Sequence, residues 1–184
     1  MKRVSRAGNK IAEAASAFRF DFDGKTVLDV GSSTGGFTEY ALEHGAIKVV
    51  AIEKGKNQMV APLRFDPRIE LHEQTDIFDV SRISMPDVVV VDVSFVSLKD
   101  VLAHVRDFIA GPKTEYLVML KPQFEARAEQ LNKGIVKNEK MRREIIKDFE
   151  FWLKRNRFLV INKRDNETHG RHGNIERFYY LKSV

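Results

Sequence analysis

The chain has 184 residues, of which 43% are hydrophobic and 31% charged, a composition typical of one globular domain with a sizeable core. It contains no cysteine, which excludes disulfides, zinc–thiolate sites, iron–sulfur clusters and thiol nucleophiles. No apolar run approaches the roughly 18 residues that span a bilayer, and no apolar signal core follows the basic first residues, so we expect a cytoplasmic protein.

The formal net charge of +5 is unevenly distributed along the chain. Residues 1–20 hold five basic residues and one acidic residue. Residues 21–126 hold eleven basic and seventeen acidic residues, and residues 127–164 hold twelve basic and five acidic residues. An acidic middle between basic flanks favours a polyanionic partner such as a nucleic acid.

Short β-branched runs alternate with helical patterns, which is typical of a parallel sheet covered on both faces. In chain order we predict a helix over residues 10–18, a strand over 26–30, a helix over 36–43, a strand over 47–53, a helix over 58–65, a weaker strand over 68–71, a strand over 87–92, a helix over 98–108 and a strand over 116–121. A mobile polar loop over 125–134, an amphipathic helix over 138–154 and a hairpin of strands 158–162 and 175–181 complete the prediction. We therefore expect one α/β domain over residues 1–184, mostly parallel with an antiparallel edge.

A glycine-containing turn after the first strand is the strongest local signal. Dinucleotide sites have glycine at the third position of the G-x-G-x-x-G fingerprint, where this chain has Ser33, which argues against NAD or FAD. The turn suits a smaller ligand without phosphate, such as the amino-acid end of S-adenosylmethionine. Glu53 at the end of the second strand can bind ribose hydroxyls, whereas Asp76 can bind an adenine amine or cap a turn. The predicted cofactor-binding residues are Asp29, Gly31, Ser32, Ser33, Thr34, Gly35, Gly36, Phe37, Glu53, Asp76 and Asp92.

Two further strand ends carry charged residues, at the edge where α/β sheets place their ligands. Asp92 follows the run Val88–Val91, and Lys121 ends another strongly apolar run. Burial of a lysine is costly unless it has a partner. One interpretation is a structural ion pair between neighbouring strands, and the other, which we favour, is a catalytic lysine beside a cofactor.

Several motifs together resemble the TlyA-type family, often called haemolysins, whose members are FtsJ-like 2′-O-methyltransferases of ribosomal RNA with the Rossmann-like class I methyltransferase fold. The motifs are Val4-Ser5-Arg6-Ala7-Gly8-Asn9-Lys10, Asp29–Thr38, Asp92-Val93-Ser94-Phe95, Lys121-Pro122-Gln123-Phe124-Glu125, Lys133-Gly134-Ile135-Val136 and Gly173-Asn174-Ile175-Glu176. The resemblance implies a catalytic tetrad of Lys10, Asp92, Lys121 and Glu176. The chain departs from the family in lacking its small N-terminal RNA-binding domain and in having Ala7, Glu53 and Asp76 where Gly, Asp and Asn are more usual.

The resemblance implies S-adenosylmethionine as methyl donor, no metal, and ribosomal RNA or ribosomal subunits as partner. A ribose 2′-hydroxyl is a poor nucleophile near neutral pH and needs help with its proton and in-line placement. Lys121 acts as a base in one interpretation; in the other the lysines only position the oxygen, and the proton leaves after methyl transfer. Glu176 would orient Lys10 or the hydroxyl.

Basic side chains outside the tetrad are candidates for contact with RNA phosphates, and those on the long helix are equally compatible with a solvated surface. They are Arg3, Arg6, Lys140, Arg143 and Lys147. His169 and His172 are interpreted as loop residues, because no acidic or cysteine cluster accompanies them as a metal site would require. The alternatives to a ribosomal RNA methyltransferase are an RNA-binding module without turnover, a small-molecule methyltransferase and, least favoured, a membrane-active haemolysin.

Overall fold

A computed structural model describes residues 4–81, 83–167 and 173–184, and it contains a seven-stranded sheet of order β3-β2-β1-β4-β5-β9-β8. Five strands are parallel, and the last two run antiparallel to their neighbours. This confirms the predicted α/β fold with an antiparallel edge. The strands are β1 (Thr26–Val30), β2 (Lys48–Glu53), β3 (Ile69–Glu73), β4 (Val88–Val91), β5 (Glu115–Leu120), β8 (Phe158–Asp165) and β9 (Arg177–Ser183).

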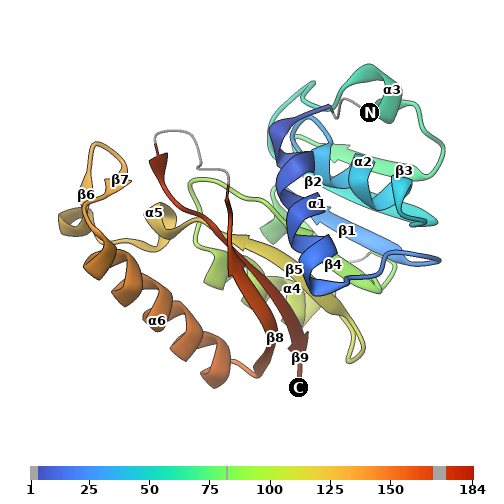
Figure 1. Cartoon of the computed structure of the whole chain (residues 1–184). Helices are drawn as coiled ribbons and strands as arrows, with labels where there is room; N and C mark the ends of the chain where they lie inside the picture. The colour runs from blue at the N-terminus through green and yellow to red at the C-terminus, as the bar shows by residue number, and fades with distance from the viewer. Residues whose placement is uncertain (1–3, 82, 168–172) are drawn as a thin grey trace.

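Helices cover both faces of this sheet, as Figure 1 shows. Helices α1 (Arg6–Phe18) and α2 (Gly36–Glu43) pack on one face in one hydrophobic core. Helices α4 (Leu98–Phe108) and α6 (Glu139–Arg155) pack on the other face in a second core. The valines of β4 alternate between the two cores, so every side chain of this strand is buried. The helices are α1 (Arg6–Phe18), α2 (Gly36–Glu43), α3 (Ala61–Arg64), α4 (Leu98–Phe108), α5 (Pro122–Glu125) and α6 (Glu139–Arg155).

The helix predicted over residues 58–65 is wrong in length, because α3 has only one turn. The backbone N–H groups of Asn57, Gln58 and Met59 donate instead to the carboxylate of Glu73. These bonds hold the preceding residues in a non-helical path. Pro62 then lies in the first turn, where a missing N–H costs nothing.

The mobile loop predicted over residues 125–134 is also wrong, because most of this segment is regular. It contains the 3₁₀ turn η2 (Ala128–Gln130) and a hairpin of β6 (Leu131–Asn132) and β7 (Ile135–Val136). Lys133 and Gly134 have φ values of 48° and 79°, the left-handed conformations that a two-residue hairpin turn requires. Sequence reasoning missed the hairpin because its strands are only two residues long.

The other element boundaries lie within a few residues of the prediction, and two of the shifts matter for the site. Helix α1 begins at Arg6 rather than Lys10, so Lys10 lies inside the helix instead of at its start. Strand β9 begins at Arg177 rather than Ile175, so Glu176 immediately precedes the strand. Among the described helices, none has both the length and the apolar character needed to cross a membrane.

Candidate active site

A cavity of about 610 Å³ opens at the carboxyl ends of β1, β2 and β4. The chain crosses from one side of β1 to the other after β3, so the cavity lies where the strand order reverses, the place where open α/β sheets bind ligands. Its wall combines acidic and apolar side chains. The lining residues are Val30, Gly31, Ser33, Ile52, Glu53, Lys54, Thr75, Asp76, Ile77, Phe78, Asp92, Val93, Ser94, Phe95 and Val96.

The turn between β1 and α2 is shaped by close packing of the protein on itself. A Cβ atom on Gly31 would lie 2.7 Å from the carbonyl oxygen of Asp92, and one on Gly36 would lie 2.8 Å from the backbone nitrogen of Gly8. Gly35 has a φ of 97° and faces Leu63. Glycine is therefore needed at these positions for packing within the protein, in addition to the predicted need to leave room for a ligand. Of the predicted turn residues, Gly31 and Ser33 line the cavity, whereas Phe37 lies in the core.

Asp29 ends up fully buried beneath this turn, at the end of β1. One carboxylate oxygen accepts a hydrogen bond of 2.6 Å from the hydroxyl of Thr38, and the other has no hydrogen-bond partner. The pKa of Asp29 is raised to about 7, mainly by burial and also by the charges of Asp92 and Glu53, while the hydrogen bonds from Thr38 oppose the rise. The hydroxyl of Ser32 is likewise buried without a partner. Unsatisfied buried oxygens of this kind are suited to a polar ligand.

Two predicted carboxylates are anchored at the cavity wall by the backbone. Glu53 accepts hydrogen bonds from the N–H of Ser33 at 2.9 Å and of Gly55 at 2.6 Å, one on each oxygen. Asp76 caps the 3₁₀ turn η1 (Ile77–Asp79) and pairs with Lys54 at 2.8 Å. The hydrogen bond from Lys54 is the main cause that lowers the pKa of Asp76. Asp76 therefore caps a turn and also lines the cavity.

The four residues of the implied tetrad form two ion pairs. The Nζ of Lys121 lies 2.6 Å from Asp92 and donates to the hydroxyl of Ser94 at 2.9 Å. The Nζ of Lys10 lies 2.5 Å from Glu176. Each of the four side chains is 5–17% exposed, so the pairs are largely desolvated but reachable.

Strand register brings the two pairs to one edge of the sheet. Leu120 of β5 lies opposite Arg177 of β9, so Lys121, the next residue along the chain, continues this register opposite Glu176. Asp92 follows β4, the neighbour of β5 on its other side, and also lines the cavity. The tetrad therefore adjoins the cavity through Asp92.

Sequence reasoning missed two functional candidates in the segments that follow β4 and β5. Phe95 lines the cavity mouth, is 92% exposed, and has its ring 5.0 Å from that of Phe124. Glu125 accepts hydrogen bonds from the hydroxyl of Ser97 and the N–H of Leu98, which ties the end of β5 to the start of α4. Burial raises the pKa of Glu125. Both residues belong to sequence motifs quoted above, and this membership could have identified them as functional candidates.

The predicted RNA-contacting residues are placed on the surface where they are described. Arg6 is exposed at the first turn of α1, and Lys140, Arg143 and Lys147 are exposed on α6. Arg3, His169 and His172 lie outside the described residues. Among the residues that are described, no group of His, Cys, Asp and Glu is arranged to hold a metal ion.

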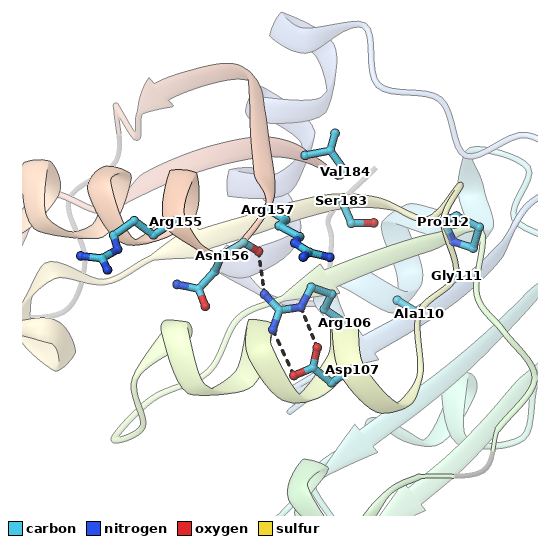
Figure 2. A pocket seen from close by; sticks show the side chains of 10 residues that line it. All are labelled: Arg106, Asp107, Ala110, Gly111, Pro112, Arg155, Asn156, Arg157, Ser183 and Val184. Carbon is cyan, nitrogen blue, oxygen red and sulfur yellow. Dashed lines mark hydrogen bonds and ion pairs between the residues drawn. The ribbon is translucent and has the colours of Figure 1, made fainter.

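A second cavity, of about 550 Å³, lies near the carboxyl ends of α4 and α6 and contains none of the predicted site residues. Figure 2 shows that Arg106 bridges these helix ends, donating to Asp107 and to the carbonyl of Asn156. Arginines at helix carboxyl ends compensate the helix dipole, so a structural role accounts for them. The first cavity is therefore the candidate active site.

The sheet order, the turn after β1 and the acids at successive strand ends define a class I methyltransferase fold. A family model for FtsJ-like methyltransferases matches residues 3–183, and the chain therefore belongs to the FtsJ-like methyltransferase family. This confirms the resemblance seen in the sequence and makes the chain an enzyme of a family that uses S-adenosylmethionine.

The relatives are similar over nearly the whole chain. It is 34% identical over 179 residues to the 23S rRNA (cytidine-2'-O)-methyltransferase TlyA of Campylobacter jejuni, a match that covers 96% of this chain and 70% of that protein. It is 36% identical to Hemolysin A of Brachyspira hyodysenteriae, covering 96% and 75%. The solved structure of a Lactococcus lactis protein that bears the label hemolysin superposes with a TM-score of 0.94 at 32% identity, covering 100% and 90%.

The residues around the cavity fit S-adenosylmethionine. The unpartnered buried oxygens of Asp29 and Ser32 provide acceptors beneath the turn. Each oxygen of Glu53 accepts one backbone N–H and retains capacity for a ribose hydroxyl. Apolar residues such as Ile77 and Val93 provide a surface for a flat aromatic base.

Proposed function

We propose that this chain transfers a methyl group from S-adenosylmethionine to a ribose 2′-oxygen of ribosomal RNA, with residues 1–184 acting as one catalytic domain. The observation that carries the proposal is the double role of Asp92, which lines the cofactor cavity and pairs with Lys121. A substrate oxygen held at this ion pair is necessarily close to the cavity. The relatives' names support ribosomal RNA as the partner, and we accordingly place the reaction in the cytoplasm.

For cofactor binding, we assign the amino-acid end to the turn after β1 and the ribose to Glu53. Asp29, Glu53 and Asp92 lie close enough to influence one another electrostatically, and Asp76 adds a fourth carboxylate at the wall. Such a concentration of acids favours a cationic ligand. When bound, S-adenosylmethionine supplies an electrophilic methyl group on a positively charged sulfur, so the transfer needs no metal.

We assign the handling of the ribose oxygen to the two ion pairs. Lys121 forms an ion pair with Asp92 and donates a hydrogen bond to Ser94, so its contacts favour the positioning role over that of a base. Lys10 approaches from α1, and Glu176 fixes its Nζ. Two cationic donors held by carboxylates would orient the hydroxyl so that a lone pair points at the methyl carbon, which is the in-line geometry that transfer requires.

Contact with RNA is assigned to the surface around this edge. The exposed ring of Phe95, braced by Phe124, offers a face on which a nucleotide base can stack. Arg6 at the start of α1 and the exposed lysines of α6 would bind phosphates, which positions RNA without reading its sequence.

The proposal is tested by methyl transfer to ribosomal subunits and to deproteinised ribosomal RNA, using isotopically labelled cofactor. We expect wild-type protein to label RNA at a ribose position resistant to alkaline cleavage, and Lys121→Ala to lose roughly 100-fold or more in rate because in-line placement is lost. Lys113→Ala is the matched control, since this exposed lysine precedes the other end of β5.

Three results would contradict this assignment. Equal rates for wild type and Lys121→Ala would remove Lys121 from the mechanism. Label on a base would overturn the ribose as acceptor. Cofactor binding by calorimetry without transfer to any ribosomal substrate would leave the chain as an RNA-binding module.

A further inference from the structure

The short segment that carries Glu176 into β9 is fixed by a charged side chain from another part of the chain. Arg142 lies on α6 beside the exposed Arg143, yet its own side chain is only 8% exposed. It falls on the buried stripe of the helix with Ile145, Ile146 and Phe149. Burial of a guanidinium is costly unless its donors are satisfied by hydrogen-bond acceptors.

Its closest partners are the backbone before Glu176 and a shared carboxylate, and Glu139 on the same helix lies farther away, at 3.9 Å. The Nε of Arg142 donates to the carbonyl oxygen of Ile175 at 3.2 Å, and its Nη2 donates to Asp165 at 2.6 Å. Arg177 donates to both oxygens of the same Asp165, at 2.6 and 3.0 Å. Although burial raises it, these hydrogen bonds lower the pKa of Asp165 overall. The residues on either side of Glu176 are therefore tied to one charged cluster.

Glu176 itself is held between this cluster and α1. Its carbonyl oxygen accepts from the N–H of Asn166 at 2.9 Å, and its carboxylate accepts from Lys10 and, at 3.5 Å, from the amide of Asn166. The strand β9 begins one residue later, so the backbone at Glu176 is held by this single bond from Asn166, just beyond the end of β8. Arg142 adds a second anchor, at the carbonyl of the preceding residue.

An apolar residue at position 142 would fill the same space without the cost of a buried charge. A guanidinium differs in that its planar fork fixes two acceptors in one geometry. Here the two acceptors belong to β8 and to the segment that carries Glu176. Arg142 thus specifies where this segment lies relative to β8, in addition to packing α6.

We propose that Arg142 and Asp165 form a positioning pair that holds Glu176, and through it Lys10, at the ribose oxygen. This inference rests on the proposed methyltransferase function and deepens it. Arg142 does not contact substrate in this arrangement. Its loss should lower the rate of transfer and leave cofactor binding intact, since neither Arg142 nor Asp165 lines the cavity.

The first test compares Arg142→Gln and Arg142→Lys with wild type in steady-state methyl transfer. We expect Arg142→Gln to lower kcat on the order of 10- to 100-fold, with the KM for S-adenosylmethionine changed less than about twofold. Arg142→Lys should be intermediate, because an ammonium cannot hold both acceptors in the same fork. Arg155→Gln, an exposed arginine at the far end of α6, is the control and should behave as wild type.

The second test reads the position of Lys10 without methyl transfer. Acylation of surface amines followed by mass spectrometry measures the reactivity of Lys10, whose side chain is 13% exposed and paired in the wild type. We expect Arg142→Gln to increase labelling of Lys10 several-fold under conditions where thermal melts show folded protein, with Lys113 labelling unchanged. This readout holds even if the wild type proves inactive on ribosomal RNA, so it separates the two proposals.

The inference is overturned if Arg142→Gln keeps wild-type kcat and wild-type Lys10 reactivity. It is also overturned if activity falls only in proportion to the loss of folded protein, with Lys10 reactivity unchanged in the folded fraction. A rise in the KM for S-adenosylmethionine with constant kcat would assign Arg142 to cofactor binding instead.

Discussion

At the scale of single residues, carboxylates of the same chemical type lie in very different environments around this site. Asp29 is fully buried with one unpartnered oxygen, and its pKa rises to about 7. Glu73 lies on the same edge of the sheet, and its pKa falls to about 2: burial opposes the shift, but hydrogen bonds from Met59, Arg64, Asn57 and Gln58 outweigh it. Hydrogen-bond supply, rather than residue type, decides which carboxylate keeps its charge.

The raised pKa of Asp29 makes stability depend on pH in a defined window. Because the folded state holds the proton up to about pH 7 and the unfolded chain releases it near 3.8, the free energy of unfolding should fall as pH rises between these values. The slope is at most about 1.4 kcal/mol per pH unit. Urea unfolding of wild type and Asp29→Asn at several pH values measures the difference. A difference that is constant from pH 4 to 8 would contradict the prediction.

At the scale of elements, α1 is the part of the site that depends most on packing between helices. Its only role in the proposed chemistry is to carry Lys10, which is placed by the close contact of α1 with α2. That contact is possible because Gly36 leaves room for the backbone of Gly8. In the other ion pair, Asp92 follows β4 and Lys121 follows β5, and these two strands are hydrogen-bonded to each other. Lys10 is thus positioned less directly than Lys121.

Gly36→Ala should therefore damage both stability and activity. The added Cβ would lie 2.8 Å from the backbone nitrogen of Gly8, so α1 must shift, at a cost of about 1–3 kcal/mol. Because Lys10 moves with α1, methyl transfer should fall even at temperatures where the variant is folded. Denaturant unfolding and kcat measure the two effects. Gly24→Ala, where no atom lies within 4 Å, should cost only backbone strain and leave kcat unchanged; equal kcat in both variants would contradict the argument.

At the scale of the whole molecule, the site lies between the basic start of α1 and a second basic surface on α6. Figure 1 shows the amino-terminal end of α6 and the β6–β7 hairpin on the same side of the protein as α5, which follows Lys121. The exposed residues Lys140 and Arg143 lie at that end of the helix. The basic flanks of the sequence are thus brought toward the edge that bears the tetrad.

Neutralising the α6 surface should weaken RNA binding without changing the chemistry. In the triple variant Lys140→Gln, Arg143→Gln and Lys147→Gln, the slope of log affinity against log salt should decrease by about 2–3, because each phosphate contact contributes about 0.7–0.9. Filter binding to ribosomal RNA across salt concentrations measures the slope.

The matched control for this prediction makes the same charge change at the opposite edge, in the exposed residues Lys113, Arg155 and Arg157, each changed to Gln. It should keep most of the wild-type slope. Equal slopes for the two triple variants would show that only net charge matters. A lower kcat at saturating RNA in the α6 variant would contradict a purely positioning surface.

Local patterns were sufficient to predict most of the fold and half of the tetrad. The uninterrupted valines of β4 indicate a strand buried on both faces, and the sequence places Asp92 and Lys121 at the ends of two such apolar strands, where they form an ion pair. Helical periodicity also puts Arg142 on the buried stripe of α6 with Ile145 and Phe149, a signal that sequence reasoning passed over. The hairpin β6–β7 escaped prediction because two-residue strands leave no periodicity to detect.

The order of elements, the chemistry at each strand end and, through the motifs, the family can all be predicted from the amino-acid sequence. These features are encoded locally, in hydrophobic period and in turn residues. The pairing of distant residues depends instead on how the elements pack in three dimensions. Lys10 and Glu176 are 166 positions apart, and their contact requires α1 to pack on the sheet that contains β9. The unpartnered oxygen of Asp29 and the anchoring of Ile175 by Arg142 have the same origin, because burial and hydrogen-bond supply are properties of the folded chain.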